Sequence, residues 1–376
     1  MRGDDMRRGR QPSFLKTFAA TLLAGVAAAP PALAQESGGG ATARPGGIAE
    51  TPNLVRGDEL NERQKAAVER GLAWLAARQG DPAAFGTRGY NNGHAGITAL
   101  AGIAFMQAGN LPGRGKYGRE VQACLDFVLN SCTESGLIAA DMSQGPMYGH
   151  GFATLFLAEV YGMTQDEAVK EKLQKAVKLI QKTQNREGGW RYQPVPYDAD
   201  ISVTICQVMA LRAARDAGIK VEKDVIDKSI QYVLNCQNVD GGFSYMARGG
   251  GGGNSGFPRS AAGVAALYYA GVFEGKNLER GLGYLKQFTP GPGRSTNQDG
   301  HYFYGHYYAV QAMFLAGGDY WAKWYPGIRD ELIGLQKPTG EWDGDFSSDY
   351  ASSMALIILQ MPNRYLPVYA GKGPGS

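Results

Sequence analysis

The sequence predicts an all-α protein in which six helical hairpins form a closed double ring. Three observations support this prediction. A short pattern recurs about every 52 residues, and such a period is typical of a repeat architecture. Each unit holds an amphipathic helix and then a helix that is apolar on nearly all sides, which must be buried from every direction. Six such pairs bury both kinds of helix only when the apolar helices form an inner ring inside the amphipathic ones.

The residues before the repeats are typical of an exported chain. Residues 1–34 hold a basic stretch, an apolar run and a small-residue triplet at 32–34, which together predict a signal peptide. The apolar run is too short for a membrane anchor, because a spanning helix needs about 20 apolar residues. Residues 35–57 are expected to be a flexible linker. We therefore expect a periplasmic or extracellular protein, with the export route left open.

The composition indicates a globular domain. Hydrophobic residues make up 44% of the chain and charged residues 19%, which excludes intrinsic disorder and a highly charged coiled coil. Without residues 1–34 the chain has 33 basic and 33 acidic residues. A neutral mature chain gives no electrostatic reason to expect nucleic acid or an anionic membrane surface as a partner.

The repeat is marked by the residue that ends each amphipathic segment. The marks are 53, 52, 53, 50 and 49 residues apart. They are Gln79, Cys132, Gln184, Gln237, Gln287 and Gln336. A glycine usually follows four residues later and an aromatic residue six residues later, and the full pattern Q-x-x-x-G-x-(F/W) occurs three times.

We interpret this pattern as a structural staple and not as chemistry, because it recurs wherever the fold turns. In the third repeat, Gly188 can take the left-handed conformation that ends a helix and turns the chain inward. The amide of Gln184 can then meet neighbouring backbone groups under the ring of Trp190. We expect Thr164 and Glu167 to form a capping box at the start of the amphipathic helix.

These residues carry a resemblance to a known family. The segments QNREGGW (184–190), QNVDGGF (237–243) and QKPTGEW (336–342) resemble the QW repeats of the squalene cyclase and protein prenyltransferase β-subunit superfamily. The similarity spans residues 58–365 and implies an α6–α6 toroid with a central cavity, with the domain at residues 58–370. The motif is specific for the fold and weak for the reaction.

An ionisable residue lies near the start of each inner helix. Aligned at their starts, the helices place these residues in one slot at the mouth of the ring: His94, His150, Asp200, Arg259, His306 and Asp349. One turn deeper the residues are smaller or less polar, as in Thr204. We expect a polar rim above an apolar throat. The alternative is that these residues only cap helices or reach water.

The resemblance also suggests catalytic residues. Class II terpene cyclases carry a D-x-D-D motif at an inner helix start, and its middle Asp protonates an alkene or epoxide. The segment DADI places Asp198 and Asp200 on the first and middle positions, while Ile201 replaces the last Asp. The resemblance thus implies Asp200 as the acid and Asp198 as its neighbour. Burial at the top of an apolar throat favours the neutral acid.

The same reading predicts the residues that bind the substrate, which we expect to be a hydrophobic, isoprenoid-like molecule. They are His94, His150, Arg259, His306, Asp349, Thr204 and Tyr304. Aromatic residues are concentrated late in the chain and can stabilise carbocations, or they can simply pack. We assign no cofactor to the protein, and a protein partner is left open.

Other functions remain as alternatives. The resemblance favours a terpenoid cyclase or a prenyltransferase-like activity on an isoprenoid lipid. The protein prenyltransferase reaction itself is disfavoured, because Arg259 and Ser260 stand where the resemblance requires a zinc-binding Cys. One alternative is a toroid that binds a ligand or a protein without chemistry. Another is an exported polysaccharide lyase or hydrolase that uses Tyr148, His150, Arg259 and Tyr304.

The sequence gives weak support for a metal site and none for disulfides. Four candidate ligands lie in neighbouring repeats of the closed ring: His306, Asp349, His94 and His150. Helices about 10 Å apart leave these side chains a long reach to a common point, so no metal is assigned. The four cysteines, Cys124, Cys132, Cys206 and Cys236, are expected to be buried thiols.

Overall fold

The computed structural model describes residues 59–80, 84–86, 93–140, 145–247, 253–291, 300–344 and 346–369. All of them belong to one compact unit, residues 45–376. The predicted signal peptide and linker at residues 1–57 lie outside the described residues.

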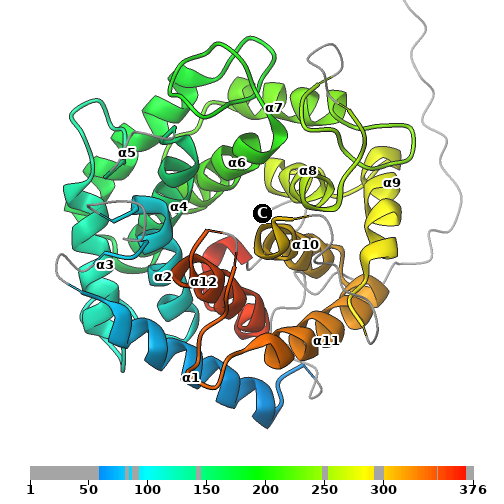
Figure 1. Cartoon of the computed structure of the whole chain (residues 1–376). Helices are drawn as coiled ribbons and strands as arrows, with labels where there is room; N and C mark the ends of the chain where they lie inside the picture. The colour runs from blue at the N-terminus through cyan, green and yellow to red at the C-terminus, as the bar shows by residue number, and fades with distance from the viewer. Residues whose placement is uncertain are drawn as a thin grey trace, which may run out of the picture. The chain divides into compact units, whose positions relative to one another are not determined.

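Twelve α-helices of the described chain alternate between an inner and an outer ring (Figure 1). The inner helices are α2 (Ala95–Gln107), α4 (Met147–Thr164), α6 (Ile201–Asp216), α8 (Phe257–Ala270), α10 (Tyr302–Ala316) and α12 (Ser348–Leu359). The outer helices are α1 (Glu62–Arg78), α3 (Gly118–Asn130), α5 (Glu167–Thr183), α7 (Lys223–Asn235), α9 (Lys276–Leu285) and α11 (Gly318–Leu335). Short 3-10 turns form η2 (Lys286–Phe288), η4 (Met361–Asn363) and η5 (Pro367–Tyr369).

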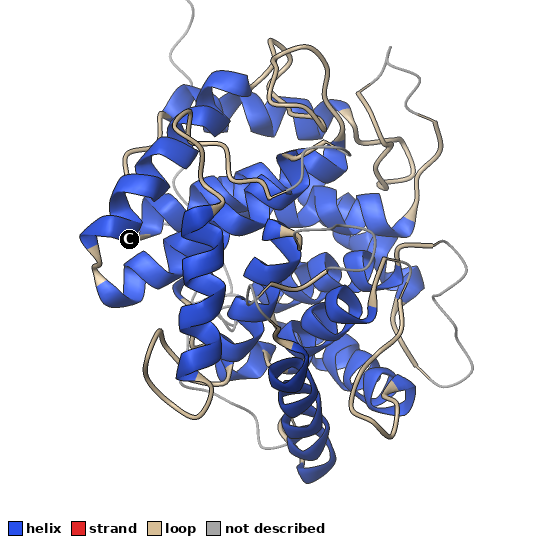
Figure 2. Ribbon diagram, turned by 60° about the vertical axis from the view of Figure 1, so that its left-hand side comes forward, coloured by secondary structure: helices blue, strands red, loops and turns tan. Residues whose placement is uncertain are grey.

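Both rings close. Each inner helix contacts the next, and the last, α12, contacts the first, α2; in the outer ring, α1 packs beside α11 and α12. Every residue of α2 is buried, as expected for a helix that is apolar all round. Figure 2 shows helices joined by loops and no strand in the described part of the chain. The predicted α6–α6 toroid is confirmed.

The outer helices bury one stripe each. In α5 the buried side chains include Val169, Leu173 and Ile180, at helical spacing, while the opposite face is exposed. The predicted capping box is wrong. Helix α4 runs to Thr164, and Asp166 is the residue that caps α5 by accepting hydrogen bonds from the next turn.

The staple predicted from the repeat is confirmed in atomic detail. Gln184 Nε2 donates to the Gly188 carbonyl at 2.9 Å and to the Val225 carbonyl of α7 at 2.8 Å. Trp190 covers this turn, and its Nε1 donates to the Ile180 carbonyl at 2.8 Å. The amide of Gln184 therefore ties its hairpin to the next outer helix, as that of Gln237 does by donating to the Asn277 carbonyl of α9 at 2.8 Å. The sequence alone did not reveal this role.

The same staple closes the ring. Gln336 Nε2 donates to the Gly340 carbonyl and to the Ala67 carbonyl of α1, both at 2.8 Å. Arg70 donates to the amide oxygen of Gln336 at 2.6 Å. The first and last outer helices are thus joined by one side chain.

Replacing Gln336 is expected to loosen this closure. Gln336→Leu should lower the free energy of unfolding by about 2 kcal/mol, because two backbone carbonyls lose a donor and the exposed hydrogen bond from Arg70 is lost as well. Gln174→Leu, on the exposed face of α5, is the control and should change it by less than about 0.5 kcal/mol. Urea unfolding of both variants measures the difference. Equal effects would contradict the closing role of Gln336.

The C-terminal segment covers the end of the ring where the inner helices finish. Gln360 and Asn363 donate to carbonyls in the last turns of α2, those of Ala104 and Gln107. The turn η5 packs against α4 and α6, and Leu366 is fully buried. The opposite end, where the inner helices begin, is the open end.

The structure tests the expectation that the four cysteines are buried thiols. All four cysteines are free thiols; three are buried, and Cys132 is half-buried, so the prediction of four buried thiols is wrong for Cys132. None of the helices in the described ranges is long and apolar enough to cross a membrane.

Candidate functional site

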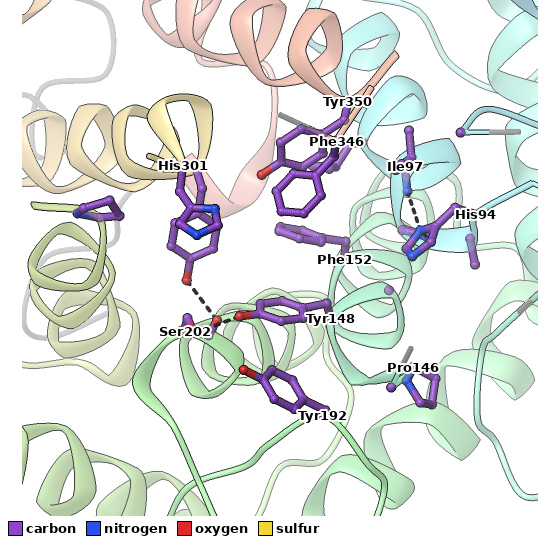
Figure 3. A pocket seen from close by; sticks show the side chains of 18 of the residues that line it. His94, Ile97, Pro146, Tyr148, Phe152, Tyr192, Ser202, His301, Phe346 and Tyr350 are labelled. Atoms are coloured by element: carbon purple, nitrogen blue, oxygen red, sulfur yellow. Dashed lines mark hydrogen bonds between the residues drawn. The ribbon is translucent and has the colours of Figure 1, made fainter. Parts of the chain in front are cut away.

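A cavity of about 760 Å³ opens at the N-terminal ends of the inner helices. Aromatic side chains form a substantial part of its wall (Figure 3). The aromatic residues that line it are Tyr148, Phe152, Tyr192, Tyr245, Tyr284, Tyr304, Phe346 and Tyr350. The polar side chains of the wall include His94, Ser202, Arg259 and His301. Among the described residues that line the cavity, none is a carboxylate.

A chain of hydrogen bonds leads from this wall to a buried carboxylate. Tyr148 Oη donates to Ser202 Oγ at 2.7 Å, and Ser202 Oγ donates to Asp200 Oδ1 at 2.7 Å. Tyr304 Oη donates to the backbone carbonyl of Ser202 at 2.9 Å. Figure 3 shows Tyr148 and Ser202 pointing toward each other at the cavity edge.

Asp200 itself is fully buried and does not line the cavity. It is the N-cap of α6, and its Oδ1 accepts from the Val203 amide at 2.9 Å. Its Oδ2 lies 3.7 Å from Arg191 Nε, and the same Arg191 pairs with Asp198. Burial raises the pKa of Asp200, against the opposing hydrogen bonds of Ser202 and Val203. The neutral acid is therefore easier to form here than in water.

The inner helices do not begin where the sequence analysis aligned them. In five repeats the backbone amide of the sixth residue after the mark donates to a side chain in the first turns of the inner helix. The acceptors are Thr98, His150, Thr204, Ser260 and Ser352. The common slot, four residues earlier, holds His94 and Asp200, both N-caps. The alignment is wrong for His150 and Arg259, which lie deeper.

His150 is consequently part of the wall between the rings. It is fully buried, its Nδ1 accepts from the Ile138 amide at 3.1 Å, and its position corresponds to that of Thr98 and Thr204. Burial lowers the pKa of His150 to about 4. The ring is therefore neutral near pH 7 and fixes the turn that precedes it.

Three of the predicted site residues line the cavity, and six do not. His94, Arg259 and Tyr304 line it. The six that do not are Asp198, Asp200, His150, His306, Asp349 and Thr204.

The last three of these have partners within the ring. Asp349 accepts from the Gly86 amide at 2.9 Å and pairs with Arg78 at 3.3 Å. His306 is buried with its ring 4.9 Å from that of Phe257, and burial lowers its pKa to about 3. Thr204 accepts from the Trp190 amide at 3.1 Å.

Ser202 and His301 are among the cavity residues that the sequence analysis missed. Ser202 looked like an ordinary residue of an apolar helix, although its place two residues after Asp200 is within reach of that carboxylate. His301 precedes its helix, stacks on Phe346 with ring centres 5.9 Å apart, and has a φ of 55°. A left-handed residue other than glycine is uncommon and marks a constrained position.

The proposed arc of metal ligands does not form a cluster. His150 and His306 are buried away from the cavity wall, whereas His94 lies on it. In the described part of the chain, no three His, Cys, Asp or Glu side chains gather closely enough to hold a metal ion.

The buried histidines make the fold sensitive to acid. The pKa of His150 is about 4 in the folded protein and about 6.5 when unfolded, so the unfolded chain binds more protons between these values. Stability should therefore fall by about 3 kcal/mol as the pH drops from 6.5 to 4. In His150→Gln this part of the fall should vanish, as measured by urea unfolding at several pH values. An unchanged pH dependence would contradict a neutral, buried His150.

Comparison with known proteins agrees with this architecture. The family model of the squalene-hopene cyclase C-terminal domain matches residues 153–321. Over these residues, which lie within the ring of helices, the chain is similar to the squalene-hopene cyclases. No curated protein matches it in sequence.

The solved structures that resemble this chain include two kinds of enzyme. The type II terpene cyclase MstE from Scytonema, in complex with geranylgeranyl dihydroxybenzoate, has a TM-score of 0.54 at 13% identity, covering 81% of this chain and 98% of that one. The alpha-1,6-mannanase GH76A of Salegentibacter sp. HEL1_6, as an inactive variant with alpha-1,6-mannotriose, has a TM-score of 0.63 at 10% identity, covering 80% and 99%. At these identities the likeness shows the fold alone.

Proposed function

We propose that the protein is an exported terpenoid cyclase-like enzyme that binds an isoprenoid-like molecule in its cavity and uses Asp200 as the proton source. One observation carries the proposal: a cavity of about 760 Å³ lined by eight aromatic residues, with a buried carboxyl group that is hydrogen-bonded to Ser202 of its wall and, through Ser202, to Tyr148. Aromatic faces stabilise cations within about 6 Å, and burial raises the pKa of Asp200, which favours the protonated acid. Export is proposed from the pattern of residues 1–34 alone.

Binding without chemistry is the second candidate. It is favoured because Asp200 caps α6 and because none of the described residues on the cavity wall is a carboxylate. The carbohydrate alternative has less support. Tyr148, Arg259 and Tyr304 line the cavity but His150 does not, and glycoside hydrolysis commonly needs two carboxylates beside the scissile bond.

The bound molecule can be identified directly. We expect organic extraction of the natively purified protein, followed by mass spectrometry, to yield an isoprenoid lipid near one per chain. Phe152→Asp places a charge on the cavity wall and should abolish this binding. Val239→Asp, at a side chain that is 86% exposed and outside the cavity, is the control and should keep it.

Two results would overturn the proposed ligand class. A glycan in the extract would favour carbohydrate chemistry. An empty protein that also fails to take up added squalene or geranylgeranyl diphosphate would exclude an isoprenoid ligand.

A further inference from the structure

The position of Asp200 raises a difficulty that the chain of hydrogen bonds resolves. An acid must reach the atom that it protonates, yet Asp200 is fully buried and absent from the cavity wall. Ser202 and Tyr148 do line the cavity, and each is 2.7 Å from the next member of the chain. Proton transfer needs heavy atoms about 2.6–3.2 Å apart, so both links are short enough.

We propose that Asp200 delivers its proton to the ligand through Ser202 and Tyr148, so that the Tyr148 hydroxyl is the group that touches the reacting atom. This inference rests on the proposed role of Asp200 as the proton source. Tyr148 is then the catalytic residue at the wall, and Ser202 is the link between it and the buried acid.

Neighbouring contacts hold the hydrogen-bonded residues Tyr148, Ser202 and Asp200 in place. Tyr304 Oη donates to the Ser202 carbonyl at 2.9 Å, which fixes the first turn of α6 against α10. The ring of Tyr148 lies against that of Tyr192, with centres 6.0 Å apart. Asp200 Oδ1 is held by the Val203 amide at 2.9 Å. Two inner helices and the N-cap of α6 therefore fix the path before a ligand enters, as preorganised catalysis requires.

The proposed step moves one proton along three oxygens. In the structure both hydroxyls donate toward the carboxylate, and in the proposed step they turn to donate in the opposite direction once Asp200 is protonated. The carboxyl proton then passes to Ser202 Oγ, the Ser202 proton passes to Tyr148 Oη, and the Tyr148 proton passes to an alkene carbon. The π-electron pair of the alkene forms the new C–H bond, and the adjacent carbon becomes a cation. Asp200 is left as a carboxylate and regains a proton from water when the cavity empties. No other reactant is needed.

The charges around Asp200 set the pH range of this step. Arg191 faces it with Nε 3.7 Å from Oδ2, and Arg191 is itself paired with Asp198. Other titratable groups that interact with Asp200 lie on α4, α6, α7, α10 and the loop after α7: Tyr148, Cys206, Tyr232, Cys236, Tyr304 and Tyr245. Since burial raises the pKa of Asp200, conversion should fall as the pH rises through that pKa.

The test removes each hydroxyl in turn. We expect Tyr148→Phe and Ser202→Ala each to reduce conversion of squalene or geranylgeranyl diphosphate at least 100-fold, with binding of the same compound changed less than threefold. Ser202→Thr restores the hydroxyl and should recover most of the activity. Tyr232→Phe is the matched control. Tyr232 is a buried tyrosine near Asp200 that does not line the cavity and is not one of the three hydrogen-bonded residues of the proposed relay.

A second readout does not depend on turnover. Carboxyl-¹³C NMR of labelled protein follows the titration of Asp200, which Ser202→Ala should shift upward because a hydrogen bond to the charged form is lost. Tyr148→Phe should shift the same titration through Ser202.

The outcomes separate this inference from the proposed function. If Asp200→Asn is inactive while Tyr148→Phe remains active, the relay is wrong and the role of Asp200 survives. If Asp200→Asn remains active, both the relay and the role of Asp200 as proton source are wrong. If the wild type converts neither compound, the proposed enzymatic function is wrong. In that case the NMR titration still tests the hydrogen-bonded path: a titration of Asp200 that is unchanged in both Tyr148→Phe and Ser202→Ala would show that the path does not exist.

Discussion

Asp200→Asn is expected to reduce conversion of an isoprenoid by at least 100-fold, the usual size of a general-acid contribution, while leaving the fold nearly intact. Asn caps a helix about as well as Asp, so the hydrogen bond to the Val203 amide can persist. The amide has no acidic proton to give. Product analysis by gas chromatography and thermal unfolding of the same sample measure the two effects.

Asp166→Asn is the matched control for this substitution. Asp166 is the N-cap of α5 in the outer ring and does not line the cavity. The same Asp-to-Asn change there measures the effect of altering a helix cap away from the candidate site. Conversion should stay at the wild-type level. If both variants lose activity equally, the loss reflects folding. If Asp200→Asn retains activity, Asp200 is a helix cap only.

Gly188→Ala is expected to be the most damaging small substitution in the ring. Gly188 has a φ of 99°, and an added Cβ would lie 2.1 Å from the Lys228 carbonyl oxygen of α7. A backbone atom cannot rotate away as a side chain can. Left-handed strain and overpacking together should lower the free energy of unfolding by about 3–5 kcal/mol, as measured by urea unfolding.

Gly218→Ala separates strain from crowding. Gly218 also has a positive φ, 88°, but nothing lies within 4 Å of an added Cβ. Only the strain remains, so the loss should be about 1–2 kcal/mol. Similar losses in the two variants would show that the close approach to α7 contributes little and that the motif glycine serves only to turn the chain.

The fold could be predicted because its signals are local and repeated. Gln184, Gly188 and Trp190 occur at fixed spacing, and helix termination explains each of them before any tertiary contact is known. Which carbonyl the amide would meet could not be derived. Besides the nearby Gly188 carbonyl, Gln184 donates to the carbonyl of Val225, 41 residues further on, and the position of Val225 depends on how the next hairpin packs.

The candidate site was harder to predict because the loops before the inner helices differ in length. Ile138 and its acceptor His150 are 12 residues apart, whereas Phe243 and Ser260 are 17 apart. An alignment that counts from the helix starts therefore placed His150 at the mouth, where the structure has Pro146 on the cavity wall. Asp200 was identified by its motif, but its route to the cavity through Ser202 and Tyr148 depends on side chains from two helices.

Conversion in heavy water tests the central claim most directly. If the reaction starts by protonation from Asp200, a carboxyl group that exchanges with solvent, then wild-type protein in D₂O should release a cyclised product that carries one solvent-derived deuterium on carbon. Mass spectrometry of the product counts it. A cyclised product without deuterium, or no conversion of squalene and geranylgeranyl diphosphate by protein that binds them, would contradict the account.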